Sequence, residues 1–408
     1  LPIYRRWREA GRLRSRGGAG RVGKGHVESS QRGSDNTPGT AKGWQAPNRF
    51  NALDNTRAGV HKVCMRLPLR LGLFVLGALV LAAEKPARDV TFLSTSDSHY
   101  RQVDHPQGHH NDLNAVTIAQ MNGIAQVEWP AKLGGGLIAR PRAVLSLGDL
   151  IDNGDTKLGD RVIGREQFAL YAADFGVFPG TARLNYPTME CWGNHDGPPV
   201  GKEKSGFSLQ AELIARNRQR QAKGVLANLS ANGLHTSWDW DDVHFVQLGL
   251  YPADTQHAAI KYNRVWHDPQ AALTFLREDL ARLVGRSRRP VVLMSHCGFD
   301  TDWWHPEDWA AAYAVAKDYN VVLYLYGHTG TGLKAWAPAG EARKWDCLND
   351  GHTDAGFFVV QFVGDRLRAA YRAKAGLKVI KGKPGEPTQA QWDGTWEWRF
   401  PLDKKIGD

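Results

Sequence analysis

The chain has 408 residues, and its 52 Lys and Arg against 42 Asp and Glu give a formal net charge of +10 at pH 7. Residues 1–83 contain 15 basic and 4 acidic residues, whereas the other 325 residues contain 37 basic and 38 acidic ones. The positive charge therefore lies in the N-terminal segment, and the rest of the chain is close to neutral. With 42% hydrophobic and 23% charged residues, the composition excludes collagen-like, coiled-coil and disulfide-framework proteins.

The first 64 residues are rich in Arg, Gly, Ser and Asn and show no hydrophobic periodicity. Such a segment has no apolar face whose burial would offset the entropy of ordering it, so we expect it to be disordered. A basic arm that binds nucleic acid is the alternative interpretation, but no aromatic interleaving or binding-fold pattern accompanies the charge. We therefore expect no nucleic-acid binding by the rest of the chain.

A secretory signal peptide is predicted at residues 65–83. Met65–Arg70 is a short positive region, Leu71–Leu81 is an uncharged apolar run, and the small residues after it suit a cleavage site. The run is shorter than the roughly 20 residues that a helix needs to cross a bilayer, so no stable membrane anchor is expected. The pattern predicts that translation starts at Met65, that residues 1–64 are a leader outside the working protein, and that the mature chain is secreted or periplasmic after cleavage near Ala82 and Ala83.

From Val90 onward, apolar runs of strand length alternate with longer segments of helical periodicity, which is typical of a layered α/β domain. The predicted core strands are Val90–Ser94, Ala143–Leu147, Thr188–Trp192, Val243–Leu248, Val291–Met294 and Val321–Tyr326. The predicted helices are Ala115–Ala125, Arg165–Phe175, Leu209–Lys223, Pro269–Val284 and Pro306–Lys317. We expect a domain over residues 84–374 that closes with a hairpin at Gly356–Val363 and Leu367–Ala373. A tail over residues 375–408 follows, in which Trp396–Phe400 is a candidate edge strand.

Three cysteines follow residue 83, so at most one disulfide can form among them; they are Cys191, Cys297 and Cys347. Two of these cysteines stand beside polar motifs. We interpret these two, Cys191 and Cys297, as small buried side chains at strand ends, because free cysteine packs as a small apolar group.

Five polar clusters follow the C-terminal ends of five predicted strands, where open α/β sheets place their ligands. In chain order they are Asp97–His99, Gly148–Asn153, Gly193–Asp196, Ser295–His296 and Gly327–Thr329. Each cluster alone is compatible with an ordinary turn. Together they offer carboxylate, imidazole and carboxamide groups, which bind divalent transition metals. Their order and repeated position therefore predict a metal site at the strand ends.

A hydrolytic centre with two metal ions requires these residue types. Its ions lie roughly 3.5–4 Å apart, share one bridging carboxylate and keep open positions for water and substrate. A bridging water loses its proton more readily, and the cations neutralise the charge that develops on a phosphoryl group during in-line displacement. Protonation of the leaving group requires a positioned acid such as His. The clusters are therefore suited to metal-assisted hydrolysis of phosphoesters.

In chain order the five clusters read Asp-X-His, Gly-Asp-X-X-Asp, Gly-Asn-His-Asp, an isolated His and Gly-His-X. The same order is seen in calcineurin-like metallophosphoesterases, which the chain resembles from about Val90 to Gly330. The Gly-Asn-His-Asp element at Gly193–Asp196 is the most specific part. The resemblance implies a four-layer α/β/β/α sandwich with helices outside two facing mixed sheets. It also implies two divalent metal ions (Mn, Fe or Zn) and hydrolysis of a phosphomonoester or phosphodiester by metal-bound hydroxide.

The same resemblance implies a ligand set for each metal. Asp97 and His99 would bind the first metal, and Asp149 would bridge the two. The second metal would be bound by Asn194, His296 and His328.

The resemblance further implies that His195 is the catalytic imidazole, which stabilises the transition state and protonates the leaving oxygen. Asp196 or Asp152 would orient a neighbouring group and so take part in catalysis. Asp152 and Asn153 would support the site from behind the ligands, or simply cap their turn.

One position departs from the family pattern, in which the last motif is usually Gly-His-X-His and its second His completes the first metal site. Here Gly330 stands at that position, so water or another side chain must fill it. The candidate replacements are His352 and the loop residues His105, His109 and His110. We expect a weaker and more exchangeable first metal. A non-catalytic or single-metal binding protein with the same fold is the alternative, although the retained His195 and Asp149 favour an enzyme.

Overall fold

The computed structural model describes residues 88–260, 262–299, 305–380 and 386–407. The predicted leader and signal peptide lie outside these residues. Among the residues that are described, no helix combines the length and apolar character needed to cross a membrane.

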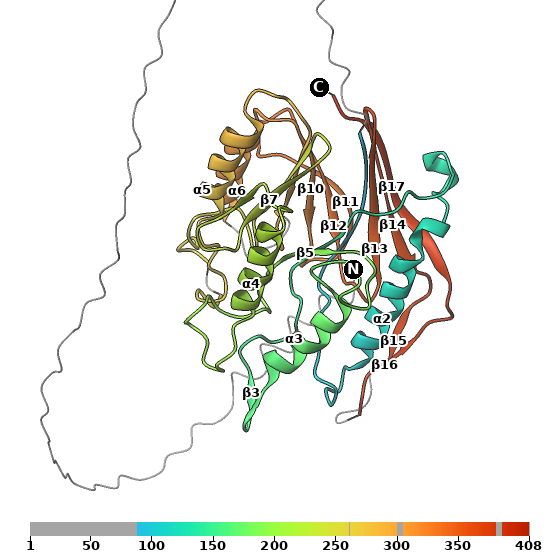
Figure 1. Cartoon of the computed structure of the whole chain (residues 1–408), viewed down its shortest axis with the longest axis vertical. Coiled ribbons are helices and arrows are strands. Elements are labelled where there is room, and N and C mark those ends of the chain that lie inside the picture. The colour runs from blue at the N-terminus through green and yellow to red at the C-terminus, as the bar shows by residue number, and fades with distance from the viewer. Residues whose placement is uncertain (1–87, 261, 300–304, 381–385, 408) are drawn as a thin grey trace, which may run out of the picture. The chain divides into compact units, whose positions relative to one another are not determined.

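The first sheet has six strands in the order β17-β14-β13-β1-β2-β5. Figure 1 shows its β17, β14 and β13 side by side. Its strands are β1 (Asp89–Thr95), β2 (Val144–Leu147), β5 (Thr188–Cys191), β13 (Gly356–Val363), β14 (Arg366–Lys374) and β17 (Trp396–Lys405). β1, β2 and β5 are parallel to one another, whereas β13, β14 and β17 extend the sheet by antiparallel pairing from β1. β17 is an edge strand within the segment for which the sequence analysis expected one.

The second sheet has seven strands in the order β11-β12-β10-β9-β8-β7-β6. Its strands are β6 (Asn228–Leu229), β7 (Thr236–Trp240), β8 (Val243–Gln247), β9 (Val291–Met294), β10 (Val321–Tyr326), β11 (Thr331–Trp336) and β12 (Trp345–Asp350). β8, β9, β10 and β12 are parallel, and the strands at both edges pair antiparallel. Both sheets are therefore mixed, as the sequence analysis expected.

The two sheets pack face to face on an apolar layer. Phe92 of β1 meets Phe245 of β8 edge to face, with the ring centroids 5.4 Å apart. Every residue of β2, β5, β9 and β10 is buried, because both faces of these strands are covered. The continuous apolar sequences of β9 and β10 are typical of strands between two layers.

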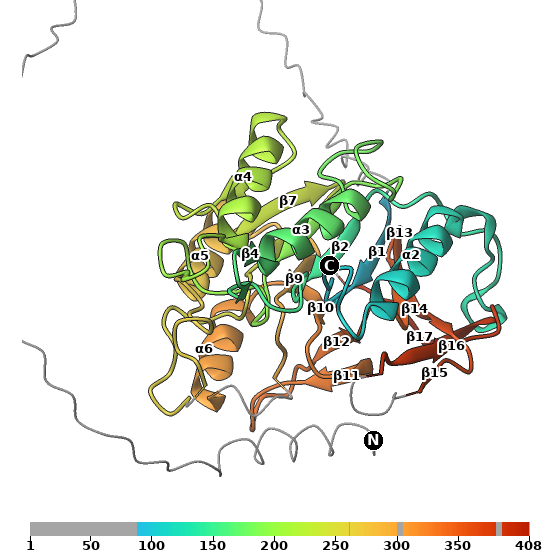
Figure 2. The same ribbon diagram turned by 90° about the horizontal axis from the view of Figure 1, so that it is seen from below.

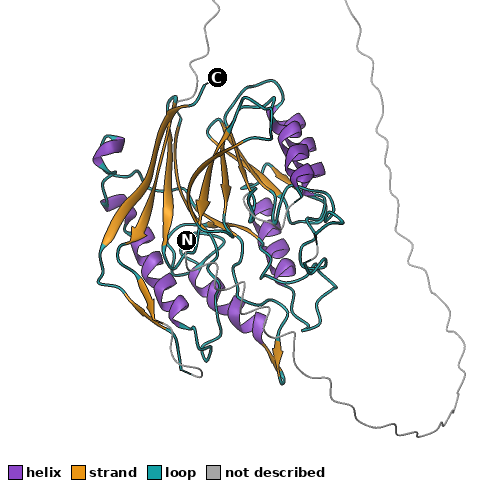
Figure 3. Cartoon of the chain, turned by 180° about the vertical axis from the view of Figure 1, so that it is seen from behind, coloured by secondary structure: helices purple, strands orange, loops and turns teal. Residues whose placement is uncertain are grey.

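The outer faces of the sheets are covered by helices (Figures 2 and 3). The helices are α2 (His109–Asn122), α3 (Ile163–Asp174), α4 (Leu209–Ala222), α5 (Ala272–Asp279) and α6 (Pro306–Ala316). α5 continues as a π-helical turn, η4 (Leu280–Val284). Their buried side chains form one apolar cluster with the outward-facing residues of the strands. The result is the expected four-layer α/β/β/α arrangement.

Local sequence signals explain where two of these helices begin. Ser208 caps α4, and its hydroxyl accepts a hydrogen bond from the Ala211 backbone N–H at 3.2 Å. α6 has Pro306 in its first turn, followed by two acidic residues that suit the positive end of the helix dipole.

Short elements complete the described chain. They are the 3₁₀ turns η2 (Ile124–Gln126) and η3 (Ala131–Leu133) and the two-stranded pairs β3 (Lys157–Leu158) with β4 (Arg161–Val162) and β15 (Lys378–Ile380) with β16 (Gln389–Gln391). All three cysteines after residue 83 are buried, and no disulfide joins any of them within the described residues.

Candidate metal centre

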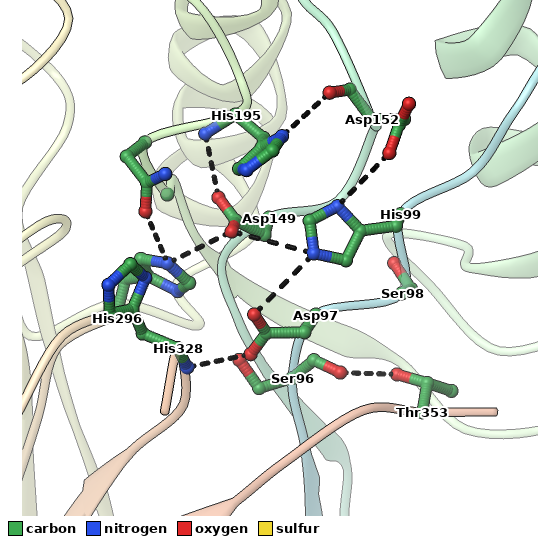
Figure 4. Close-up of polar contacts among 12 residues, drawn as sticks. Ser96, Asp97, Ser98, His99, Asp149, Asp152, His195, His296, His328 and Thr353 are labelled. Carbon is green, nitrogen blue, oxygen red and sulfur yellow. Dashed lines mark hydrogen bonds and ion pairs between the residues drawn. The ribbon is translucent and has the colours of Figure 1, made fainter. Parts of the chain in front are cut away.

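The five polar clusters meet where strands of both sheets end (Figure 4). The first three clusters follow β1, β2 and β5 of the first sheet, and the last two follow β9 and β10 of the second. Backbone hydrogen bonds join the clusters: the Asp97 N–H donates to the Gly148 carbonyl at 3.0 Å, and the Gly327 N–H donates to the His296 carbonyl at 2.7 Å. All six predicted metal ligands are thereby brought to one place.

The backbone of the centre is held in an uncommon conformation. Four of the six predicted ligands have positive φ, at 51° for Asp97, 40° for His99, 49° for Asp149 and 69° for His328. A non-glycine residue in this region carries a cost of about 1–3 kcal/mol and persists only where the surrounding structure enforces it. The strain here is concentrated on residues whose side chains face one another.

Two motif glycines allow the clusters to approach closely. A Cβ at Gly193 would lie 2.2 Å from Asp149 Oδ1, and a Cβ at Gly327 would lie 2.5 Å from Asp97 Oδ2. Any larger residue would displace a predicted ligand, so these positions require glycine.

Asp149 occupies the middle of the centre. Its Oδ2 lies 3.2 Å from His296 Nε2 and 3.6 Å from His99 Nε2, and its Oδ1 accepts a hydrogen bond from the His195 backbone N–H at 2.8 Å. Two sets of potential metal-binding atoms, each within 4.8 Å of one another, share this carboxylate: one adds His99 and His195, the other Asp97 and His296. This arrangement is what a carboxylate between two ions requires.

His296 anchors the side of the centre predicted to hold the second metal. Its Nδ1–H donates to the Leu147 carbonyl at 2.7 Å, which leaves Nε2 directed at Asp149 and at Asn194 Oδ1, 3.1 Å away. A hydrogen bond at one ring nitrogen commonly orients the other toward a metal. The His328 ring packs 5.2 Å from the His296 ring. Cys297 lies close enough to both to form another potential binding group, although the sequence analysis treated it as a packing residue.

His99 anchors the side predicted to hold the first metal. Its Nε2 is 3.6 Å from Asp97 Oδ1, and its Nδ1 is 3.6 Å from Asp152 Oδ1. The same Asp152 oxygen accepts a hydrogen bond from Arg101 at 2.8 Å, and Asp97 Oδ2 accepts one from the His328 backbone N–H at 2.8 Å. Asp152 therefore lies behind His99, where a supporting residue was predicted.

His195 lies at the open side of the centre, with its ring 4.7 Å from the His99 ring. Its Nδ1–H donates to the backbone carbonyl of Asp152 at 2.8 Å. The Asp196 carboxylate instead accepts hydrogen bonds from the backbone N–H groups of Ile151 at 3.0 Å and Gly193 at 2.6 Å. Asp196 thus fixes the loops, and a backbone carbonyl rather than its carboxylate orients His195.

Asn153 differs from its predicted position behind the ligands. The residue is exposed, and its backbone N–H donates to Gln167 Oε1 at 3.0 Å. This places it in the turn that the sequence analysis gave as the alternative.

The buried charges of the centre stabilise one another. Burial raises the pKa of the Asp149 carboxyl, but the opposing charges of His296 and His195 outweigh it and hold that pKa well below its usual range. Burial lowers the pKa of His296, yet the carboxylate of Asp149 raises it to about 9. Imidazole protons therefore balance the buried carboxylates, and these are the protons that a bound cation displaces. The donor set of carboxylate, imidazole and carboxamide fits divalent transition metals.

The four histidines considered as replacements at Gly330 lie in different surroundings. The His352 ring is 5.4 Å from the ring of His99, a predicted ligand. His110 Nδ1 is 2.5 Å from Asp354 Oδ2, and the His109 ring lies 4.4 Å from that of His110. His105 Nδ1 accepts a hydrogen bond from the Gln107 backbone N–H at 3.1 Å.

Two further histidine-bearing features were not anticipated from the sequence. His267 is buried near the centre, and burial lowers its pKa. The charges of Asp149, His195 and His296 also act on this pKa: the carboxylate raises it and the two imidazoles lower it. It comes from a long loop after β8 that carries no motif. Away from the centre, His257 and His305 stack with their rings 3.5 Å apart beside Glu307.

Comparison with known proteins identifies the sequence pattern. Residues 90–331 match the family model of the calcineurin-like phosphoesterases. No curated protein sequence matches the chain. Among solved structures, TT1561 of Thermus thermophilus has 15% identity over 68% of this chain and 94% of its own, with a TM-score of 0.33. A single mutant of Vps29 from Entamoeba histolytica has 10% identity over 78% of this chain and 100% of its own, with a TM-score of 0.31. The 5'-nucleotidase from Candida albicans has 12% identity over 67% of this chain and 47% of its own, with a TM-score of 0.34.

Proposed function

Because the chain belongs to the calcineurin-like phosphoesterase family, we propose that it is a hydrolase of phosphomonoesters or phosphodiesters that uses two divalent metal ions. The observation that carries the proposal is the position of Asp149, whose carboxylate is shared by two sets of potential metal-binding atoms. A carboxylate shared by two such sets is what a centre with two ions requires.

The residues that would hold the ions divide around Asp149. Asp97 and His99 serve one ion, and Asn194, His296 and His328 serve the other. When bound, the ions supply Lewis acidity that polarises a phosphoryl group and activates water.

His195 and its neighbours supply the proton chemistry. Because Nδ1–H is held by the Asp152 carbonyl at 2.8 Å, the other ring nitrogen is left to meet the leaving oxygen of the substrate. Its protonated form donates a proton there, which stabilises the departing alkoxide. Asp152 links this group to the ligand His99, 3.6 Å from its carboxylate, so that acid and ligand share one support.

The central experiment assays the purified chain on an aryl phosphate and a bis-aryl phosphate, after metal removal and after addition of Mn²⁺ or Zn²⁺. We expect turnover of at least one substrate that disappears with chelation and returns with the metal. The relative rates then distinguish a phosphatase from a phosphodiesterase. A chain that binds two ions and hydrolyses neither ester would favour the alternative of a non-catalytic binding protein.

Export is a separate part of the proposal, supported by the charge and apolar pattern of residues 65–83. Expression of the chain with and without this segment, followed by mass spectrometry of the N-terminus in the exported fraction, tests it. We expect export only with the segment present, and a new N-terminus near Ala83. Equal export of both forms would contradict it.

A further inference from the structure

Gly330 stands where the family pattern has the second His of its last motif, and its backbone is unsuited to that side chain. Its φ of 145° lies in a region that L-residues rarely adopt, and no heavy atom lies within 4 Å of an added Cβ. A histidine here would therefore be strained, and its Cβ would have no packing contact within 4 Å. The fourth position of the proposed first metal is therefore left to water or to another side chain.

The pairing of β11 with β12 brings another segment to the same position. Thr331, the first residue of β11, pairs with Asp350, the last residue of β12. The residues before one and after the other therefore leave the sheet side by side. A Cβ at Gly351 would lie 2.0 Å from Thr331 Oγ1 and 3.0 Å from the Gly330 carbonyl oxygen, so the two glycines are neighbours. His352 follows immediately.

The segment around His352 is tied to the loop that carries the first-metal residues. The Thr353 backbone N–H donates to the Ser96 carbonyl at 2.8 Å, and the Thr353 hydroxyl donates to the same oxygen at 2.8 Å (Figure 4). The Thr95 hydroxyl bonds to the Thr353 hydroxyl at 2.9 Å. Ser96 directly precedes Asp97, and Thr353 is fully buried. His352 is therefore held at a fixed place beside the ligands.

The His352 side chain is itself available for a ligand role. Its ring lies 5.4 Å from the His99 ring and is inclined 30° to it, and the residue is half-buried rather than enclosed. Another candidate, His110, is paired with Asp354, whose Oδ2 lies 2.5 Å from His110 Nδ1. We propose that His352 supplies the ligand of the first metal that Gly330 cannot. The inference rests on the proposed function, because it assumes a metal on this side of Asp149.

Metal titration tests the inference without any assay of activity. Purified, metal-free chain is titrated with Co²⁺ by calorimetry and by visible absorption, for the unmodified protein and for His352→Ala, His352→Gln and His105→Ala. The unmodified protein should bind two ions. Both His352 variants should lose affinity for one ion by at least about 10- to 100-fold, with a changed Co²⁺ spectrum. His105→Ala, a histidine in the neighbouring loop, should retain both affinities.

Labelling of the unmodified protein with diethyl pyrocarbonate gives a second measurement that needs no variant to fold. Mass spectrometry should show that Mn²⁺ slows modification of His352 and leaves that of His105 unchanged. Two ions bound equally by the His352 variants, or absence of protection at His352, would overturn the inference and leave the proposed function standing. Failure of the unmodified chain to bind two ions would overturn both.

Discussion

Two buried ionic clusters next to β5 show how a structural cluster differs from a candidate metal centre. The Glu190 carboxylate, fully buried on β5, is bound by the guanidinium groups of Arg216 and Arg220 from α4. These groups also donate to the backbone carbonyls of Phe175 at 2.7 Å and Thr188 at 2.5 Å. Asp149 is equally buried, but its partners are imidazoles, which carry charge only when protonated. The Glu190 cluster thus has permanent counter-charges, whereas the centre at Asp149 can exchange protons for cations.

The backbone conformation also differs between the Glu190 cluster and the residues around Asp149. Glu190 lies in a regular strand, paired with Ser146 of β2. The residues around Asp149 have positive φ, which the chain maintains against a local cost. Backbone strain, together with counter-charges that depend on protonation, therefore distinguishes the cluster at Asp149 from the Glu190 cluster where burial does not.

Asp149→Asn should have the largest effect, because it removes the charge that both ions would share. Turnover should fall by about 10³-fold or more, with loss of metal from the purified protein. Steady-state kinetics and elemental analysis measure the two effects. Asp160→Asn, an exposed carboxylate in the turn between β3 and β4, is the matched control and should change neither. Full turnover with two retained ions would remove Asp149 from the mechanism.

His195→Ala should lower turnover by about 10²–10⁴-fold while both ions remain bound. The loss should be small for aryl leaving groups of low pKa and large for alkyl ones, because only the latter need a proton. Rates across such a series, with metal content measured in parallel, test this prediction. Loss of one ion would instead make His195 a ligand, a role that its distance from His99 and Asp149 permits.

Glu190→Gln should destabilise the fold rather than impair the metal centre. It leaves two guanidinium groups buried without their counter-charge, which costs about 3–5 kcal/mol of unfolding free energy. Urea denaturation measures this, and the metal stoichiometry of the folded fraction should be unchanged. Glu212→Gln changes a half-buried residue of α4, the helix that carries the two arginines, and should change the free energy of unfolding by less than about 0.5 kcal/mol. Equal stability of both variants would contradict the structural role of the Glu190 cluster.

His235 illustrates a third arrangement, a buried group kept neutral, and should give the smallest effect. Burial, against the Trp192 ring among others, lowers its pKa from 6.5 to about 4, although its hydrogen bond to the Gln270 carbonyl at 2.9 Å opposes the shift. Because the pKa of His235 is lower in the folded state, the contribution of the neutral ring to the free energy of unfolding is fully present above pH 6.5. It is lost as the pH falls toward 4. The slope is about 1.4 kcal/mol per pH unit within that window. His235→Gln should flatten it in urea titrations of metal-free protein, and an unchanged slope would refute the assignment.

Continuous apolar strands were the most predictable part of the fold. β9 and β10 begin and end at the predicted residues, because they are continuous apolar runs buried on both faces. β7, β11 and β12 were not predicted, since polar residues interrupt their sequences and pairing with neighbouring strands holds them in the sheet. Helix α2 begins at His109, earlier than the predicted Ala115, in a polar stretch without apolar periodicity.

The residues of the candidate site likewise divide into those that the sequence predicted and those that it did not. The residues that follow core strands were found from their motifs, because parallel strands bring their C-terminal ends to one edge. The approach of His352 to His99 depends on how β12 ends beside β11, and the position of His267 depends on the path of a long loop. Neither follows from spacing in the sequence.

The order of strands in the first sheet has a consequence for when the centre can exist. β1, which leads into Asp97 and His99, lies between β2 and β13, and β13 begins only at Gly356. Contacts between segments so distant in sequence are slow to form because the chain between them must first be closed into a loop. We therefore expect the candidate metal centre to form late in folding, after almost the whole chain has been synthesised. A polypeptide that stops before β13 would contain every motif residue of the family pattern and still lack a strand that holds them in register.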